Sequence, residues 1–415
     1  MAIVINFAPD GGGLYAAYAS QFFEVQDTVP TGQTPAALQV AVKNNGNLVE
    51  TLYYPAIEVI TGSPDDTCIF RLDLKEIAQR LFTPTLLLPG VLAGSHNQTF
   101  NSEVLSLNCD FQTWKPNGDN LLVLDPAVES SVAYRVINAV VYMNEEPQMG
   151  PYKYAIERKF LTNKPLHGWT DLPANEFLYV FNPDDTDFYW IFEFRNAAGT
   201  LKSKLRVNNT NQDNRIMSKG VGAANVLATS WDAVISTDGD PNGNGIVPGV
   251  AYYDVYGSSS TSGATPITDV RRYYVRRDNM CVTYRIHFLN KLGAWDYFPV
   301  TSEPNDVLTP SNDGYETTMP ESFSEGSTRA HVRNRGQVRA DEGFEVEVAG
   351  FSPKAALWLQ ELAISSKAFI EMEPRDNPGQ TRLYPIVIRN SQFNKSERNF
   401  KFEVVFSREV ISQRS

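Results

Sequence analysis

The sequence has little of the residue types from which disulfide frameworks, metal centres and nucleophilic sites are built. Its 415 residues include three cysteines, Cys68, Cys109 and Cys281, and four histidines that lie far apart. A small, odd number of cysteines argues against a disulfide framework and is typical of proteins made in a reducing compartment. Apolar runs are also short. Because none reaches about 18 residues, we expect no transmembrane helix and no membrane insertion.

Basic residues are in deficit. The chain has 36 lysines and arginines against 48 acidic residues, which gives a formal net charge of −12. An acidic surface repels phosphate backbones and so argues against nucleic-acid binding. The amino-terminal run MAIVINFAPDGGG lacks the basic segment of a secretion signal, so we expect a protein assembled in the cytoplasm. With 42% apolar and 20% charged residues the composition is that of a folded protein, and the length allows about two to four domains.

Alternation of apolar and polar residues predicts strands along much of the chain. In 187–195 aromatic side chains occupy every second position, which predicts a half-buried strand. Residues 282–289 and the stretch from Phe400 to Ser407 alternate in the same way. The many strand signals and the 12% aromatic content predict a mainly β protein.

Two helices are expected among the strands. Residues 72–82 place several leucines and an isoleucine near one helical face. The second helix has clearer signals, because Ser352 is a suitable N-cap and Pro353 stands at the first helical position, where a missing N–H costs nothing. This helix is expected to continue to about Ser366.

These elements predict several β-sandwich or barrel-like domains, the first and last each with one packed α-helix. Polar stretches such as 162–173 separate the strand-rich blocks. The expected domains are 1–165, a β domain with one helix; 166–300, a second β domain with a long surface loop at 236–264; 301–341, an extended linker or arm; and 342–415, a strand–helix–strand domain.

The segment 301–341 lacks apolar periodicity but carries a cluster of bases. Arg329, His331, Arg333, Arg335 and Arg339 form a basic arm in an otherwise acidic protein. Unstructured connections of this length are uncommon in compact domains, so the segment is either disordered or docked on another surface. We expect it to dock on the acidic face of a neighbouring copy and to act as a subunit-interface arm.

One loop resembles half of a calcium-binding loop. Asp238, Asp240, Asn242 and Asn244 place oxygen atoms at every second position, as candidate ligands of a hard cation. The closing carboxylate is missing, because its position falls at Ala251. An Asx-rich turn is therefore the favoured interpretation, and we expect no metal and no cofactor.

No motif of nucleophilic or metal-assisted catalysis is present, and we expect that the chain is not an enzyme. Pairs of acidic residues lie in polar, turn-like contexts, and His287, beside Arg285, is expected on a sheet surface. The glycine run 11–13 is expected to be a flexible turn, since no phosphate-binding Lys-Ser pair follows. In 271–277 arginines and tyrosines interleave, but a strand would divide the bases between two faces, with acids nearby, which disfavours nucleic-acid binding.

Longer signatures recur in a distinctive order. They are CIFRLDLKEIAQRLF, KFLTNKP followed by NEFLYVF, RRYYVRRDNMCVTYRIHFLNKLGAWDYFPV, and the ending WLQELAISSKAFIEM with its paired strands. This order resembles a group of tail-associated structural proteins encoded by phages of Bacteroidetes-type bacteria. The strand–helix–strand ending is also similar to the sandwich-plus-helix module of tail-tube and distal-tail proteins. The turn at 290–293 departs from the group, with Lys291 and Leu292 where a more glycine-rich version is expected.

The resemblance implies a virion protein of the phage tail, at the tip, hub or baseplate, with no catalytic residues to carry over. Its expected partners are copies of itself in a ring and other phage tail proteins. A host-receptor or carbohydrate-binding tail protein is an alternative, with exposed aromatic side chains near 236–264 as the contact surface. An enzyme such as a wall hydrolase is a third, less favoured, alternative.

Overall fold

The computed structural model describes the greater part of the chain. The described residues are 3–9, 14–30, 37–62, 65–82, 94, 97–100, 104–116, 119, 121–139, 154–155, 157–182, 187–209, 215–237, 245–277, 284–301, 305–316, 333–349, 351–372, 381–394 and 398–406. They divide into two compact units. The first unit comprises 1–162, 166–278 and 290–296, and the second comprises 163–165, 279–289 and 297–415.

The first part of unit one is a β-sandwich. One sheet has the order β1-β3-β7-β6, and the other has the order β2-β12-β9-β4-β5, with β10 and β11 added to β9. Their bounds are β1 (Ile3–Phe7), β2 (Leu14–Ala16), β3 (Phe22–Pro30), β4 (Ala37–Asn44), β5 (Asn47–Tyr54), β6 (Glu58–Ile60), β7 (Asp65–Asp73), β9 (Val104–Pro116), β10 (Leu122–Leu124), β11 (Glu129–Ser130) and β12 (Tyr134–Ile137).

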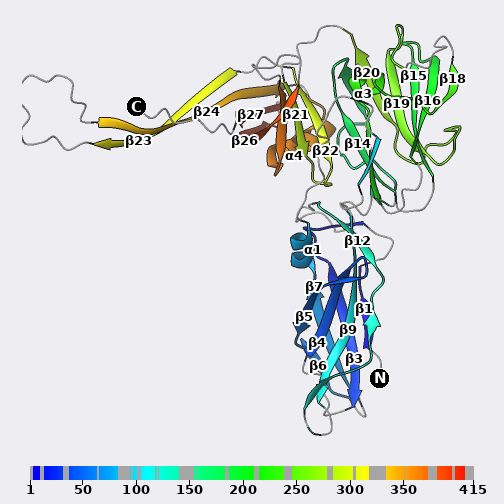
Figure 1. Cartoon of the computed structure of the whole chain (residues 1–415), viewed down its shortest axis with the longest axis vertical. Helices are drawn as coiled ribbons and strands as arrows, with labels where there is room; N and C mark the ends of the chain where they lie inside the picture. The colour runs from blue at the N-terminus through cyan, green and yellow to red at the C-terminus, as the bar shows by residue number, and fades with distance from the viewer. Residues whose placement is uncertain are drawn as a thin grey trace, which may run out of the picture. The chain divides into compact units, whose positions relative to one another are not determined.

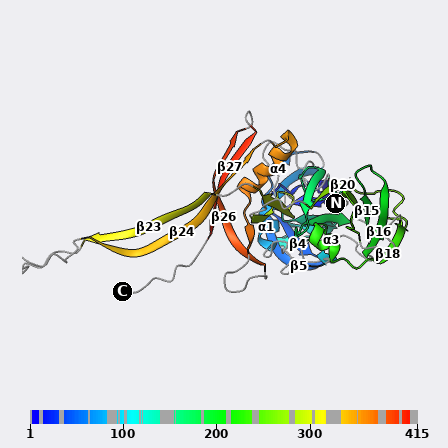
Figure 2. The ribbon, with the colours of Figure 1, turned by 90° about the horizontal axis from the view of Figure 1, so that it is seen from above.

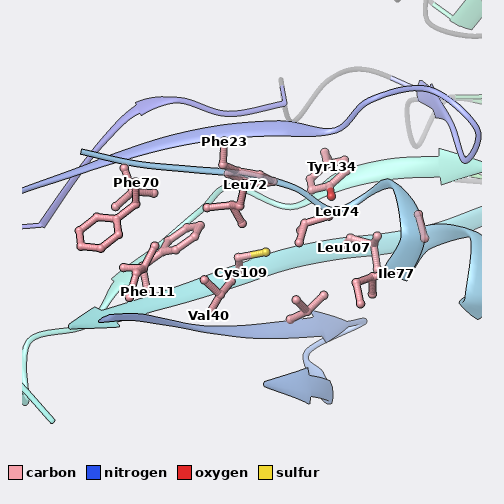
Figure 3. Close-up of a cluster of buried hydrophobic side chains, with 14 of the residues drawn as sticks. Phe23, Val40, Phe70, Leu72, Leu74, Ile77, Leu107, Cys109, Phe111 and Tyr134 are labelled. Carbon is pink, nitrogen blue, oxygen red and sulfur yellow. The ribbon is translucent and has the colours of Figure 1, made fainter. Parts of the chain in front are cut away.

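The core of this sandwich lies between the two sheets (Figure 3). Phe23 and Phe70 project from one sheet and Phe111 from the other, and the rings of Phe23 and Phe111 are 5.6 Å apart. Cys109 is buried among them, and burial raises the pKa of its thiol to about 12. Alternate residues of β3, β4, β7 and β9 are buried, so the period-two pattern of these strands is the pattern of the core.

Helix α1 (Lys75–Leu81) follows β7 directly. The sequence predicted a helix from residue 72, but Leu72 and Asp73 instead pair with β3 as the end of β7. Asp73 then accepts hydrogen bonds at one carboxylate oxygen from the backbone N–H groups of Gln21 and Lys75. The strand ladder thus takes the first residues that helical periodicity had assigned to the helix.

The second part of unit one has two further sheets. The larger has the order β13-β20-β19-β15-β16-β18 and the smaller β14-β17-β8. The bounds are β8 (Asn97–Phe100), β13 (His167–Asp171), β14 (Phe177–Asn182), β15 (Phe188–Arg195), β16 (Leu201–Asn209), β17 (Arg215–Gly220), α3 (Ala223–Leu227), β18 (Ala233–Thr237), β19 (Tyr252–Ser258) and β20 (Arg271–Arg276). The short helix α3 was not expected from the sequence, and β13 lies inside the stretch predicted to be a boundary.

The central strand β15 is buried on both faces along much of its length. As predicted, Trp190 and Phe192 face the main core. The sequence predicted a half-buried strand, yet Ile191 on the opposite face is fully buried as well. Gly263 lies so close that a Cβ atom there would stand 2.9 Å from the Ile191 side chain. The segment after β19 therefore covers this part of the outer face, which strand alternation alone does not reveal.

Unit two contains a seven-stranded sheet of order β22-β21-β25-β26-β27-β24-β23, whose strand β22 begins in unit one (Figures 1 and 2). The bounds are β21 (Tyr284–Leu289), β22 (Trp295–Val300), β23 (Asn305–Glu316), β24 (Arg333–Ala349), α4 (Pro353–Ile364), β25 (Ala368–Met372), β26 (Arg382–Asn394) and β27 (Asn399–Phe406). The segment 301–341, expected to be an extended linker or arm, thus supplies two paired strands over its described residues.

Helix α4 begins where the sequence predicted. The Ser352 hydroxyl accepts a hydrogen bond of 3.2 Å from the Ala355 N–H, and Pro353 is the first helical residue. Trp358 and Leu362 are buried against the sheet, where Trp358 contacts the rings of the core strands. The predicted fold class, mainly β with packed helices, is confirmed. None of the described helices is long and apolar enough to cross a membrane.

Candidate functional site

The hairpin of β23 and β24 lies at the edge of the last sheet and extends beyond the strands beside it (Figures 1 and 2). Residues 342–349 of β24 pair with β27 on one side and, through 342–345, with β23 on the other. Beyond that point residues 333–341 pair with β23 alone. This two-stranded part, here called the ribbon (309–316 with 333–341), leaves the outer edge of each strand without a described neighbour. At about 3.4 Å per residue it extends for about 30 Å.

The ribbon contains three residues of the predicted basic arm. Arg333 stands opposite Glu316, Arg335 opposite Gly314 and Arg339 opposite Ser311 in the antiparallel register. The register shifts between Asn312 and Gly314. The other two arm residues, Arg329 and His331, lie outside the described residues. Backbone pairing requires no apolar alternation, which explains why the strand signal was weak in this segment.

The candidate calcium ligands Asp238, Asp240, Asn242 and Asn244 lie outside the described residues, as does the glycine run 11–13. The predicted loop at 236–264 is only partly a loop, since it begins within β18 and contains β19. Within the part of the chain that the structure describes, no group of three or more His, Cys, Asp or Glu side chains could hold a metal ion.

His287 is not on a solvent-exposed surface, contrary to the sequence-based expectation. It is 1% exposed, and its Nε2 atom lies 2.5 Å from Oε1 of Glu371 on the neighbouring strand β25. The ring of Tyr297 lies 5.5 Å from the imidazole. Strand alternation places His287 opposite the core face correctly, but only the three-dimensional packing shows that this second face is buried too.

Residues 271–276 form β20, and their arginines and tyrosines divide between its two faces, as expected. Arg271 is buried, and its Nε atom lies 3.3 Å from an Asp269 carboxylate oxygen. On the opposite face Arg272 makes a bidentate pair with Asp254 of β19, at 2.7 and 2.8 Å. The nearby acids that the sequence predicted are therefore present, and they neutralise these two bases.

The outer face of the large sheet carries a second exposed feature, here called the aromatic strip (Trp169, Tyr252, Arg272, Tyr274 and Arg276). Trp169 of β13 stands opposite Tyr274 of β20, which in turn stands opposite Tyr252 of β19. The two tyrosine rings are 5.6 Å apart. The guanidinium groups of Arg272 and Arg276 lie 4.2 and 4.8 Å from the ring centres of Tyr252 and Trp169.

The charges beside the aromatic strip are paired across the strands. Glu193 of β15 accepts hydrogen bonds from Arg195 and from the hydroxyl of Tyr256, and it forms an ion pair with Lys204. Burial alone would raise the pKa of the Glu193 carboxyl, but these partners outweigh burial and lower it. The outer face of the large sheet therefore carries aromatic rings together with acidic and basic groups that are paired with each other.

Sequence reasoning missed the aromatic strip. Its signal is spread over three strands, of which β13 is far from the other two in the chain: one face of β20 carries Arg272, Tyr274 and Arg276, and β13 and β19 add one ring each. The Arg-Tyr alternation in 271–277 was visible. The partners Trp169 and Tyr252 could be assigned to it only once the strand order was known.

A buried lysine lies in the smaller sheet of unit one. Lys219 of β17 is fully buried, and its ammonium group donates a hydrogen bond of 3.1 Å to the Thr229 hydroxyl. Burial lowers its pKa to about 7, against a smaller opposing effect of Asp232. A buried amine whose proton affinity is lowered by burial makes the stability of the fold depend on pH.

Comparisons with known proteins add little. No protein-family model and no curated protein matches the sequence. One of the solved structures that match is the crystal structure of dimeric latent PorU from Porphyromonas gingivalis, with 12% sequence identity and a TM-score of 0.17. The match covers 66% of this chain and 20% of that chain. At this TM-score no property of PorU is transferred.

Proposed function

We propose that this chain is a structural subunit of a phage tail, at the tip, hub or baseplate, which assembles with copies of itself and with neighbouring tail proteins. The observation that carries the proposal is the ribbon of β23 and β24. The order of sequence signatures that resembles tail-associated structural proteins supports the same role. The proposed role is architectural and requires no catalysis by this chain.

The ribbon suits strand-mediated assembly for an energetic reason. A two-stranded hairpin is only marginally stable in water, and its outer edges present rows of backbone N–H and C=O groups. Pairing with a strand of a neighbouring subunit would satisfy these groups and cover the ribbon. Such pairing is extended and directional, so it suits a symmetric ring in which each copy contacts the next.

Charge supports the same proposal. The β24 side of the ribbon carries Arg333, Arg335 and Arg339 against one acid, Asp341, although β23 opposite it carries Asp313 and Glu316. The chain as a whole has a net charge of −12. The three arginines can therefore pair with acidic side chains of another copy, and this attraction accelerates association at low salt. Assembly is therefore expected to weaken as ionic strength rises.

The decisive experiment shortens the ribbon without disturbing the sheet. A variant in which Leu308 is joined to Glu342 through an Asn-Gly turn keeps the part of the hairpin that pairs with β27. Mass photometry and sedimentation velocity of both full-length proteins would give their oligomeric states, alone and with a tail-tube protein. The proposal expects oligomers or tail-protein complexes from the original chain and their loss in the shortened variant.

A second experiment separates the contribution of the ribbon's arginines from the effect of a change in the protein's net charge. Replacing Arg333, Arg335 and Arg339 together by glutamate should weaken assembly at low salt. The matched control replaces Arg71, Arg80 and Lys354 together by glutamate, since these three bases are exposed, lie outside the ribbon and give the same change in net charge. A full-length protein that stays monomeric and binds no tail component would refute the proposal.

A further inference from the structure

The aromatic strip forms a continuous surface that the strand register creates. Trp169, Tyr274 and Tyr252 occupy directly opposed positions on three adjacent strands, β13, β20 and β19. Adjacent strands lie about 4.8 Å apart, so the three rings follow one another across the sheet at regular intervals. Tyr274, at the centre of the row, is 43% exposed, and its two neighbours are partly exposed.

The exposure is confined to one half of this outer face. In the other half Tyr256 is 4% exposed, and its hydroxyl donates a hydrogen bond to the carbonyl of Gly263 in the covering segment. Ile191 beside it is fully buried. The segment after β19 therefore covers the half of the outer face that holds Ile191 and Tyr256. The rings of the aromatic strip lie outside that cover.

The surroundings of the rings define which ligand would fit. Arg272 is held by both oxygens of Asp254, and Arg195 donates to Glu193. Arg276, the other base of the strip, packs against Trp169 and stands opposite Asp171 in the strand register. Because each of these cations has an acid beside it, the surface has little excess charge to attract a polyanion. A guanidinium group that is paired with a carboxylate still has free N–H donors, and the carboxylate still has free acceptor positions. The hydroxyl groups of a ligand can bond to both.

We propose that the aromatic strip binds an uncharged polysaccharide chain, with pyranose rings packed against Trp169, Tyr252 and Tyr274 and sugar hydroxyls hydrogen-bonded to the neighbouring Arg272–Asp254 pair. The apolar faces of sugar rings pack on aromatic side chains, and the polar rim of a sugar needs hydrogen-bond partners. A row of rings across three strands matches a linear polymer of such rings. This inference does not depend on assembly through the ribbon.

Affinity electrophoresis of the full-length protein in gels that contain dextran, mannan, galactan or xylan tests the proposal. At least one of these polymers should retard the protein. Tyr274→Ala should weaken that retardation about tenfold, as expected for loss of one stacking ring. Tyr274→Phe keeps the ring and should retain most of the binding. Trp169→Ala should also weaken binding, and its far-ultraviolet circular dichroism would show whether the sheet is intact.

Tyr53→Ala is the matched control, since Tyr53 is a 60% exposed aromatic residue on β5 of the sandwich and lies outside the aromatic strip. Its binding should be unchanged. Poly-glutamate serves as a charged polymer without sugar rings. Retardation by none of the four polysaccharides, equal retardation of the protein and its Tyr274→Ala variant, or retardation by poly-glutamate alone would overturn the proposal. The ribbon-shortened variant should still bind, which distinguishes failure here from failure of assembly.

Discussion

His287 and Glu371 are joined within the last sheet, where the imidazole Nε2 lies 2.5 Å from a carboxylate oxygen and both residues are buried. They are diagonal neighbours, because Arg285 stands opposite Glu371 and His287 stands opposite Phe369 in the pairing of β21 with β25. A buried polar pair of this kind positions two strands against each other, since both groups have left water and bond to each other in the sheet.

The first prediction concerns this pair. Glu371→Ala should lower the free energy of unfolding by about 3 kcal/mol, since it removes the buried partner of His287. The double variant His287→Phe with Glu371→Leu should cost less than the sum of the losses of His287→Phe and Glu371→Leu measured separately, because it removes both polar groups of the pair. Urea unfolding measures both effects, with Glu58→Ala on the exposed strand β6 as a control. Additive losses would contradict a direct interaction.

The second prediction concerns Lys219, whose pKa is lowered to about 7 by burial. In the unfolded chain a lysine keeps its proton up to about pH 10.4. Between these two values the unfolded state binds more protons than the native state, so the free energy of unfolding should rise with pH, by up to about 1.4 kcal/mol per pH unit. Lys219→Met should be more stable than the original protein at pH 7, and the difference should shrink towards pH 10.

The control for this measurement is Lys354→Met, because Lys354 is exposed at the start of α4. Urea unfolding of the three proteins at intervals from pH 6 to pH 10 gives the comparison. If Lys219→Met and the original protein differed by the same amount at every pH, the ammonium group would not be the source of the pH dependence.

The third prediction concerns a close backbone contact. A Cβ atom on Gly222, the N-cap of α3, would stand 2.4 Å from the carbonyl oxygen of Ala174 and 2.5 Å from the backbone nitrogen of Glu176. Because backbone atoms cannot turn aside as a side chain can, Gly222→Ala should lower stability by about 3 kcal/mol. Gly168→Ala is the matched control, since a Cβ there meets nothing within 4 Å. Thermal unfolding that shifts equally in both variants would contradict the contact.

The fourth prediction concerns the start of α4. Ser352→Ala removes the hydroxyl that accepts from the Ala355 N–H and should cost about 1 kcal/mol of stability. Ser352→Asp should restore most of this loss, because a carboxylate oxygen can accept the same bond and is attracted to the helix N-terminus. Chemical denaturation of the three proteins measures the effect. Equal losses in the alanine and aspartate variants would argue against capping.

Local signals predicted the features that depend on neighbouring residues in the chain. Ser352 and Pro353 predicted the start of α4, and the alternating aromatic residues of β15 predicted its core face. The predicted start of α1 was wrong by a few residues, because pairing of β7 with β3 extends the strand through Asp73. Helical periodicity cannot show such pairing, since the partner strand is distant in the sequence.

The candidate sites were likewise predictable only in the part that depends on local sequence. The basic residues of the arm could be found by counting charge, but their place on a paired strand could not, because backbone hydrogen bonds carry no side-chain signature. Arg272 and Tyr274 were recognised as an alternating pattern. Their alignment with Trp169 and Tyr252 became visible only with the order of the sheet.

By itself the amino-acid sequence determined that this protein is built mainly of strands, that α4 begins at Pro353, and that acidic residues outnumber basic ones, since these depend on local periodicity and composition. The tertiary structure alone decided which strands are neighbours, and therefore that His287 is buried against Glu371 and that three rings align on one exposed face. The physical reason is that alternation assigns a residue to a face of its strand, whereas long-range packing determines what covers that face.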